Sequence, residues 1–494
     1  MPEKIGYGNG NASAVIRTPA LRFEVVLWDW DNGREGETKD ITVAVTQFRW
    51  LKSIANPVAS CDLTLVPQIL DIHYLDYLKP MDVVRIYEFG VLKYQGFIRN
   101  ISAKGSISNT GVPNRSVFLS CSSFGALLSE GQLGVNMFLK AGVYTSLSAD
   151  IISFQTELAD LVIADKPYSE FIGAVVDKWF GFLNACGATT YQAYLKRWLN
   201  LTTGMAGKII PGSPKTLMIC YGSEQSITLW SILSKLAQTP FNEMWFDCGP
   251  RKVWAEQKML SMNPASASGF TERSLRSDKD YLVIRSAPYN GTYIDGVMTD
   301  LWDTLTARKL PLSYLTQFDL NKSMDESKSF YMVSPAVYDP GGLAFVAMGN
   351  YVFDPVSFNK YLYRPAVADL YYSHLHNRLT PKDSPENRQS IYNDCVDKTR
   401  TLMEWNKRND EYLSGAFTFM VPSNDEHDPR IGDKLEIEGI DDAYFYVESV
   451  SHTWSYGNAL LSNAGVTRGF GQSSKIVLKD KIFKRAKFNL NGRF

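Results

Sequence analysis

The stretches PMDVVRI (residues 80–86) and YQGFIRNI (94–101) recur in a related form as IGDKLEI (431–437) and YFYVESV (444–450). Each pair begins with a turn that an aspartate closes, continues as an alternating strand and returns as a second strand near period two. Unrelated β-hairpins also show this sequence pattern. Taken as a repeat, the pattern predicts two related β modules in one chain.

The first β module is predicted to span residues 21–130. Its strands are rich in β-branched and aromatic residues: FEVVLWDW (23–30), ITVAVTQFRW (41–50), SCDLTLVP (60–67), DVVRIYEF (82–89), VLKYQGFIRNIS (91–102) and RSVFLSCSS (115–123). Ile41, Val43 and Val45 alternate with Thr and Ala residues, whereas other strands are apolar nearly throughout. This mixture is typical of a small barrel with a core and a packed outer face.

Residues 131–274 are predicted to form a largely helical, mixed insert. Apolar residues recur there at three- and four-residue spacing, over 149–161, 170–183, 191–201 and 226–238. The last helix is the clearest, because Ser226 can cap its first turn and Pro240 ends the pattern.

A hairpin is expected to follow these helices. Its strands run from Phe241 to Asp247 and from Lys252 to Gln257, around a Cys-Gly-Pro turn. The next stretch, 261–278, is rich in Ser, Ala and Asn and is expected to be a loop.

Residues 275–411 are predicted to be a mixed segment with a strand at 281–289 and a helix at about 385–408, while 292–384 show no clear pattern. Pro385 suits the first position of that helix. A second β tube domain is predicted over 412–472, with strand 281–289 as a candidate further member. The fold class is therefore α+β, with two barrel-like tube domains separated by a helical insert.

Composition narrows the possible functions. At about 150 residues per domain, 494 residues suggest roughly three to four domains, and 45% hydrophobic residues exclude a disordered chain. The net charge of −1 disfavours a dedicated nucleic-acid binder. No stretch approaches 18 apolar residues, so no membrane insertion is expected. The six widely spaced cysteines lack CxxC spacing and are predicted to be buried thiols: Cys61, Cys121, Cys186, Cys220, Cys248 and Cys395.

No catalytic, cofactor-binding or metal-binding residue is predicted. His374 and His376 could share a strand face, but no third ligand is evident nearby. The acidic run 424–428 lacks the spacing of an EF-hand and is expected to be a solvated hairpin tip. Sequence motifs of hydrolase elbows, zinc proteases and phosphate loops are absent, and His73 and His452 both lie in strand-like sequence contexts. The chain is predicted not to be an enzyme.

The chain resembles the central hub proteins of phage baseplates, which are related to the hub-like part of type VI secretion spike proteins. Three pieces carry the resemblance. The first is LKPMDVVRI (78–86) with QGFI (95–98) and SCSSFGALL (120–128). The second is 226–247 with the Arg-x-x-Pro-aromatic segment IRSAPY (284–289), and the third is IGD (431–433) with VESVSH (447–452) and TRGF (467–470).

The resemblance implies a homotrimer in which two tube domains per chain alternate around an axis, giving a pseudo-six-fold ring. Such a ring is an adaptor, with a six-fold tail tube or distal tail proteins above it and a three-fold central spike below. Its lumen passes DNA or the tape-measure protein without sequence-specific binding. The implied location is the virion baseplate, after assembly with other baseplate proteins in the host cytoplasm.

Several alternatives remain open at this point. The same architecture serves as the hub of a phage-tail-like bacteriocin or a secretion spike complex. A tail-associated cell-wall hydrolase needs a pair of carboxylates, which 52 acidic residues always offer on paper. Aromatic content alone would also fit an unrelated carbohydrate-binding β protein.

The two ends of the chain are predicted to be arms. Residues 473–494 hold seven basic residues against one acidic residue, a net charge of +6, with apolar residues interleaved. This pattern favours an arm that docks on a partner protein, although a solvated terminus fits as well. The polar, glycine-rich segment 1–20 has the same two interpretations.

Overall fold

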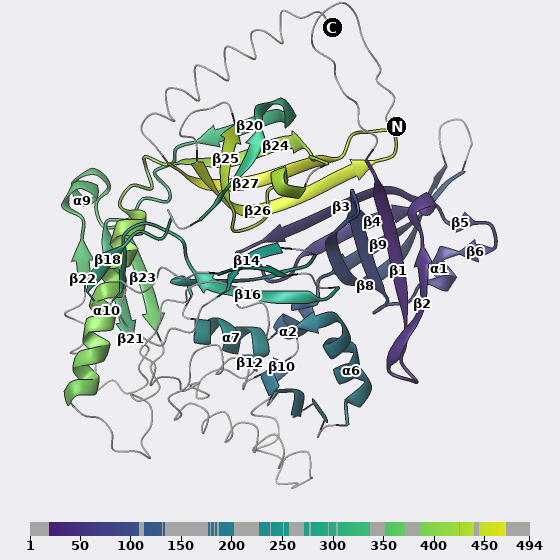
Figure 1. The fold of residues 1–494 in the computed structure, drawn as a ribbon, viewed down its shortest axis with the longest axis horizontal. Helices are drawn as coiled ribbons and strands as arrows, with labels where there is room; N and C mark the ends of the chain where they lie inside the picture. The colour runs from purple at the N-terminus through teal and green to yellow at the C-terminus, as the bar shows by residue number, and fades with distance from the viewer. Residues whose placement is uncertain are drawn as a thin grey trace, which may run out of the picture.

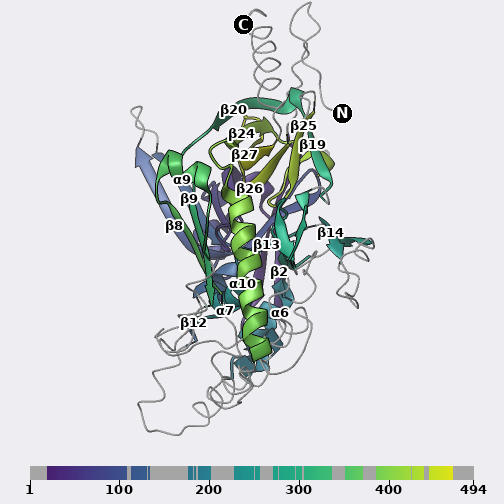
Figure 2. The same cartoon turned by 90° about the vertical axis from the view of Figure 1, so that its left-hand side faces the viewer.

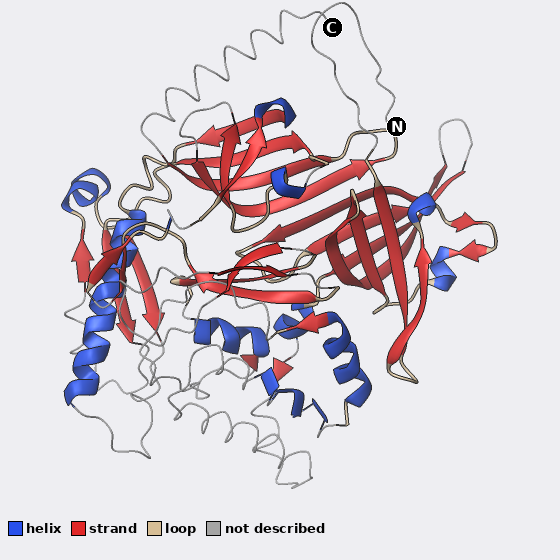
Figure 3. Ribbon diagram, viewed as in Figure 1, coloured by secondary structure: helices blue, strands red, loops and turns tan. Residues whose placement is uncertain are grey.

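The computed structural model describes residues 19–470, apart from several internal stretches. The longer of these are 108–112, 134–175, 202–226, 256–270, 336–350, 371–384 and 439–443, and shorter breaks fall at 131, 178, 182, 185–186, 238, 250, 276–277, 295, 303–304 and 424. Strands make up most of the regular structure in the described part (Figure 3). No helix within these ranges is both long and apolar enough to cross a membrane.

The first β module contains the predicted strands and one more. Its strands are β1 (Leu21–Asp29), β2 (Arg34–Asp40), β3 (Val45–Ser53), β4 (Ser60–Leu65), β7 (Val83–Glu88), β8 (Val91–Ile107) and β9 (Pro113–Ser122). The strand β2, REGETKD, was missed because its charged, mostly exposed side chains give no apolar pattern. Smaller elements are β5 (Gln68–Ile69), β6 (Ile72–His73), α1 (Tyr74–Tyr77) and α2 (Gly125–Glu130).

The predicted alternation at the start of strand 41–50 is wrong. A 3-10 turn, η1 (Thr42–Ala44), precedes β3 there. The turn buries Ile41 and Val45 but leaves Val43 79% exposed. The three residues therefore do not share one face, because a period of two applies only to extended backbone.

The second β module extends beyond its predicted limits. The strands predicted over 412–472 are β24 (Leu413–Met420), β25 (Lys434–Glu438), β26 (Tyr444–Ser455) and β27 (Leu461–Phe470). They are joined by β19 (Ala307–Pro311), the 3-10 turn η4 (Leu312–Tyr314) and β20 (Leu315–Asn321). These earlier elements come from the stretch in which the sequence shows no clear pattern.

The two modules share one sheet of 13 strands, in which β3 of the first module pairs with β26 of the second (Figure 1). The main path runs β2-β1-β7-β8-β9-β4-β3-β26-β27-β24-β20, and β25 and β19 branch from β26. The prediction of two barrels is wrong in this respect. Among the described strands neither module closes on itself, because β3 continues the sheet into the other module.

The described part of the insert contains both helices and strands, and it lies along one side of the shared sheet (Figure 1). Its elements are β10 (Gln132–Leu133), α6 (Thr189–Trp198), β11 (Leu199–Asn200), β12 (Ile227–Thr228) and α7 (Leu229–Ala237). The helices α6 and α7 confirm two predictions. Thr228 Oγ1 accepts a hydrogen bond from the Ser231 backbone at 3.1 Å and so caps α7. Ser226, 149–161 and most of 170–183 lie outside the described residues.

The predicted hairpin over 241–257 is wrong in its pairing. The strand β13 (Asn242–Asp247) pairs with β16 (Asp280–Ser286), and β14 (Arg251–Ala255) pairs with β15 (Thr271–Leu275). All six residues of β13 are buried, as suits a strand that is covered on both faces. The strand β15 also replaces part of the predicted loop, and β16 belongs to a sheet with β11 and β13 rather than to the second module.

The remaining described elements form a small layer around the predicted helix, α10 (Pro385–Asn406) (Figure 2). They are β17 (Thr292–Ile294), β18 (Val297–Thr299), β21 (Phe330–Pro335), β22 (Tyr351–Phe353), α9 (Pro355–Tyr361) and β23 (Pro365–Leu370). Leu402 and Trp405 of α10 belong to the same buried cluster as Tyr331 and Val333 of β21.

The largest hydrophobic core runs through both β modules and takes in part of the insert. Phe48 and Leu119 of the first module belong to the same buried cluster as Phe417 and Val466 of the second. Trp245 of β13 is a fully buried member from the insert. The modules and the insert are therefore packed as one body, because core contacts of this kind leave little freedom to move.

Candidate assembly site

The two β modules contain two copies of one five-strand unit. The first unit is β3, β4, β7, β8 and β9; the second unit is β20, β24, β25, β26 and β27. The sheet order is β7-β8-β9-β4-β3 in the first and β25-β26-β27-β24-β20 in the second, and every pair is antiparallel. Chain order and sheet order therefore match strand by strand, which extends the repeat beyond the hairpin seen in the sequence.

The aspartates that open each hairpin perform the same task. The Lys79 backbone N–H donates to Asp82 Oδ2 at 2.8 Å, and the Arg430 backbone N–H donates to Asp433 Oδ2 at 3.1 Å. In both turns the acceptor lies three residues after the donor. A carboxylate that accepts backbone N–H groups fixes a turn locally, which explains why both hairpins begin with aspartate.

The residue before each aspartate has left-handed backbone geometry. Met81 has φ 74° and Gly432 has φ 78°. Their N–H groups donate across the hairpin in the same way, from Met81 to the Ile98 carbonyl at 2.8 Å and from Gly432 to the Val447 carbonyl at 2.7 Å. The repeat thus extends to the backbone conformation of the turn, which glycine adopts without strain in the second copy and Met81 adopts in the first.

A β-bulge at the start of the first strand is also repeated. Thr46 Oγ1 donates to the Thr64 carbonyl at 3.1 Å, and Thr316 Oγ1 donates to the Thr418 carbonyl at 2.9 Å. The register shifts around each of these threonines. The sequence signal that could have revealed the second copy is short: VTQF at 45–48 and LTQF at 315–318.

The hydroxyl bonds of these bulges are expected to be modest contributors to stability. Replacing Thr46 by Val should lower the free energy of unfolding by about 1 kcal/mol, because the hydroxyl loses its bond to Thr64 while the shape is kept. The matched Thr316→Val variant should cost less, because Thr316 is exposed. Urea unfolding of both variants checks the order, and an equal or reversed order would contradict it.

The junction between the units is one antiparallel strand pair. Residues 47–53 of β3 face residues 449–455 of β26, with Trp50 opposite His452 and Arg49 opposite Thr453. Residues 444–446 of β26 pair with β25 along the same strand, before β3 begins. One strand of the second unit therefore holds its own hairpin partner and the edge strand of the first unit.

Beneath this junction lies a buried group of polar side chains, termed here the Glu88 network: Trp50, Glu88, Lys93, Asp428 and His452. Glu88 accepts from Trp50 Nε1 at 2.9 Å, and its second oxygen lies 2.6 Å from His452 Nδ1. The far nitrogen of His452 lies 3.6 Å from Asp428, which accepts from Lys93 Nζ at 2.5 Å. Glu88 and His452 are fully buried. The network joins four strands, β3, β7, β8 and β26, and a loop, and it draws on both modules.

The charges of the network shift the pKa values of two of its members, His452 and Asp428. Burial alone would lower the pKa of His452, but the Glu88 and Asp428 carboxylates raise it to about 9. Burial would raise the pKa of Asp428, but Lys93 and His452 hold it well below its usual range. At neutral pH the network therefore holds charged partners of both signs, and a buried charge needs such partners.

This arrangement predicts that stability falls as the pH rises above neutral. The folded protein keeps a proton on His452 up to about pH 9, whereas an ordinary His releases it near 6.5. Protonated His452 therefore contributes on the order of 3 kcal/mol to the free energy of unfolding. This contribution is complete below pH 6.5 and is lost as the pH rises through about 9. Asp280, whose pKa burial raises to about 8, acts in the same direction. Thermal melts should show the loss, and His452→Gln should reduce it; a melting temperature that climbs over this range would contradict it.

The acidic run at 424–428 is not the predicted solvated tip. It forms a 3-10 turn, η6 (Asp425–His427), and Asp428 is buried. Asp425 accepts from Lys93 at 2.5 Å and from Arg430 at 2.9 Å. The prediction failed because the cations that neutralise this run come from β8, more than 300 residues earlier, and from the next turn.

The other histidines and the cysteines have different outcomes. His374 and His376 lie outside the described residues, and His73 is exposed in β6. No group of three metal-ligating side chains occurs in the described part of the chain. The prediction of buried thiols is confirmed for Cys61, Cys121, Cys248 and Cys395, while Cys186 and Cys220 lie outside the described residues.

The insert is tied to the second unit by the arginine of the Arg-x-x-Pro-aromatic segment. Arg285 Nε donates to Glu243 at 3.2 Å, and its guanidinium lies 5.0 Å from the centre of the Trp245 ring. Arg285 also donates to Tyr446 Oη at 3.2 Å and to the carbonyl of Gly432, the left-handed residue of the second turn. This side chain therefore fixes the position of the second unit on the insert.

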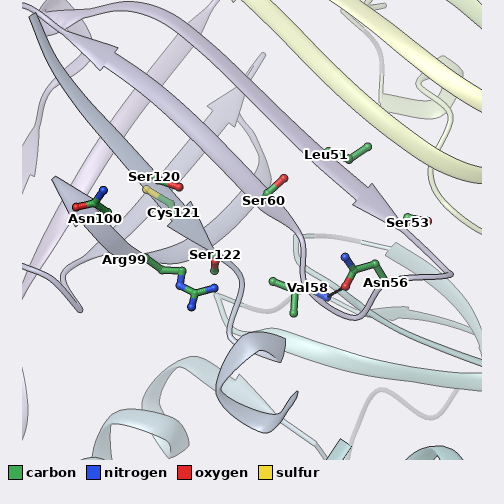
Figure 4. A pocket seen from close by; sticks show the side chains of 10 residues that line it. All are labelled: Leu51, Ser53, Asn56, Val58, Ser60, Arg99, Asn100, Ser120, Cys121 and Ser122. Atoms are coloured by element: carbon green, nitrogen blue, oxygen red, sulfur yellow. Dashed lines mark hydrogen bonds between the residues drawn. The ribbon is translucent and has the colours of Figure 1, made fainter. Parts of the chain in front are cut away.

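A surface pocket of about 430 Å³ lies over the strands of the first unit (Figure 4). It is lined by apolar side chains, including Leu51 and Val58, and by hydroxyls, two amides and a guanidinium from Ser53, Asn56, Ser60, Arg99, Asn100, Ser120 and Ser122. The guanidinium is paired with Glu130, which lies outside the lining. Burial raises the pKa of Cys121, a core residue that adjoins this pocket, well above its usual range. The lining thus offers hydrogen-bond donors and acceptors but no activated nucleophile.

Comparisons with known proteins give the following result. No protein-family profile and no curated protein match the sequence. The chain is similar in fold to a tail protein from Neisseria meningitidis, at 13% identity and a TM-score of 0.43, over 92% of this chain and 97% of that one. The 43 kDa tail protein of prophage MuSo2 from Shewanella oneidensis is 12% identical, with a TM-score of 0.43, over 91% of this chain and 97% of that one. An Escherichia coli component of the type VI secretion system is 8% identical, with a TM-score of 0.32, over 87% of this chain and 74% of that one. Two of these structural neighbours are described as tail proteins and the third as a component of the type VI secretion system.

Proposed function

We propose that this protein is the structural hub of a phage tail baseplate, which joins a six-fold tail tube to a three-fold central spike. The observation that carries the proposal is the duplicated five-strand unit. A chain with two equivalent units gives six units when three copies form a ring. Such a ring presents six similar contacts on one side and three true repeats on the other, as a junction between these symmetries requires.

The internal junction supports the ring geometry. The pairing of β3 with β26 sets the second unit beside the first through backbone hydrogen bonds, with the core continuous across the boundary. If each unit repeats this step to its neighbour, and the rotation per step closes after six units, the units form a ring with an open centre. The partners of the ring are tail tube or distal tail proteins above and the spike below, with DNA or the tape-measure protein in the lumen.

The role we propose is mechanical rather than enzymatic, within a virion baseplate assembled in the host cytoplasm. In the Glu88 network the titratable groups are engaged by one another, and the cavity beside Lys93 and Asp428 has a volume of only about 20 Å³. General acid–base chemistry needs a group within reach of a substrate. The location of these charges therefore favours a structural role at the junction.

Reconstitution with the neighbouring tail gene products tests the function. The protein is mixed with the purified tube and spike proteins encoded beside it, and the complexes are imaged by negative stain. The expected result is a particle in which this protein lies between tube and spike, and in which tube and spike do not associate without it. Direct association of tube and spike, or cell-wall cleavage by the protein in a zymogram, would contradict the proposal.

A further inference from the structure

In each unit, one strand edge of the shared sheet has no pairing partner among the described strands. The strand β20 (Leu315–Asn321) pairs with β24 and ends the sheet, with no second partner among the described strands. The strand β8 pairs with β7 only as far as Phe97; from Asn100 to Ile107 it pairs with β9 alone within the described part. Both edges therefore offer unpaired backbone groups, which natural sheets normally cover or block.

These two edges are the counterparts of the two strands that already pair at the internal junction. By the strand-to-strand match, β20 corresponds to β3, and β8 corresponds to β26. The free part of the strand edge also begins at the same place in both units. In the second unit, β25 pairs with β26 up to Tyr446 and β3 pairs with it from Ser449; in the first unit, β7 pairs with β8 up to Phe97. Phe97 is the counterpart of Tyr446, so Asn100 is the counterpart of Ser449.

We propose that β20 of one copy pairs antiparallel with the Asn100–Ser106 edge of β8 in the next copy of this chain. This inference rests on the proposed function and specifies the contact that closes the ring. The register follows from the internal junction, where Arg49 faces Thr453 and Trp50 faces His452. Because the bulge residues Thr46 and Thr316 are counterparts, Arg49 corresponds to Asp319, three residues further along each strand. Because Ser449 corresponds to Asn100, Thr453 corresponds to Lys104, four residues further along.

The transferred register therefore places Asp319 of one copy opposite Lys104 of the next. The register also places Leu320 opposite Ala103, at the positions of Trp50 and His452. Lys104 and Asp319 are both exposed in the single chain, and the Lys104 ammonium lies 3.9 Å from the centre of the Phe118 ring. Opposite charges directly across a strand pair are favourable, so the register that geometry predicts is also complementary in charge.

The strands themselves argue for a second copy as the occupant of each edge. An unrelated strand could cover one edge, but it would not explain why both edges have counterparts already paired within the chain. The two edges lie seven strands apart along the sheet, roughly 34 Å at the usual spacing of about 4.8 Å, so they cannot pair within one chain. Head-to-tail pairing between copies uses both edges at once and closes when the rotation permits.

Disulfide cross-linking tests the register. The double variant Lys104→Cys with Asp319→Cys places two thiols directly across the proposed pair, where Cα separations of about 4.5–5.5 Å suit a disulfide. Mild oxidation should give disulfide-linked chains on a non-reducing gel, with a ladder that ends at the covalent trimer. Lys104→Cys with Leu320→Cys is the matched control, because one residue of slip puts the second thiol on the opposite face. The two single variants report any link through native cysteines.

Native mass on the same samples separates the possible failures. A trimer by light scattering without a link between positions 104 and 319, or with a stronger link in the control pair, overturns the register and leaves the ring intact. A single-chain particle without a link overturns both the register and the ring. A charge swap gives a second readout: Asp319→Lys should weaken the trimer several-fold, and adding Lys104→Asp should restore it. No restoration would count against the pair.

Discussion

Replacement of Glu88 by alanine is expected to lower the free energy of unfolding by about 3–5 kcal/mol, because it leaves buried donors and a buried charge without their acceptor. Glu88 accepts the hydrogen bond of Trp50 Nε1, and its second oxygen lies 2.6 Å from His452 Nδ1. Glu88 is fully buried, so its hydrogen bonds are made in a desolvated environment where the loss of an acceptor is costly. Guanidinium unfolding, followed by tryptophan fluorescence and circular dichroism at neutral pH, measures the loss.

A surface glutamate supplies the control for this experiment. Glu37 lies on the exposed strand β2, 3.8 Å from Lys39, and its replacement by alanine should change stability by about 0.5 kcal/mol or less. Glu88→Gln keeps the side-chain shape and should fall between the two. If Glu88→Ala were as mild as the Glu37 variant, the network would not stabilise the junction.

Replacement of Arg285 by alanine is the second change with a large expected effect, also about 3–5 kcal/mol. It leaves the Glu243 carboxylate, only 7% exposed, without its cation. It also removes the donor to the Gly432 carbonyl in the turn of the second unit. Unfolding by guanidinium measures the loss, and limited proteolysis should detect earlier cleavage around that turn.

The control for Arg285 is Arg34, whose side chain is 74% exposed and lies 3.8 Å from Asp29. Arg34→Ala should cost little, because exposed ion pairs contribute about 1 kcal/mol or less. Arg285→Lys keeps the charge but loses the planar fork, and should recover only part of the stability. Full recovery by lysine would mean that charge alone, rather than the set of hydrogen bonds, fixes the second unit.

Local patterns predicted the elements whose causes are local. The aspartate turns at Asp82 and Asp433 and the strands around them follow from alternation and turn chemistry. The helix α10 follows from Pro385 and from its apolar spacing. These features are set by residues within a few positions of one another, so the sequence carries them directly.

The features that sequence reading missed depend on distant residues. The second unit begins with β20, but its next strand, β24, starts more than 90 residues later, so the repeat is interrupted by the layer around α10. The hairpin at 241–257 failed because β13 is satisfied by β16 rather than by its neighbour in sequence. The acidic loop is neutralised by Lys93 of the first unit. Long-range pairing of this kind leaves no local pattern.

The native mass of the protein after size exclusion, combined with class averages from the same peak, shows whether the protein forms the proposed ring. We predict three chains of 55.6 kDa in a ring of six similar lobes around an open centre. A stable dimer, or a closed globular particle without a central opening, would contradict it.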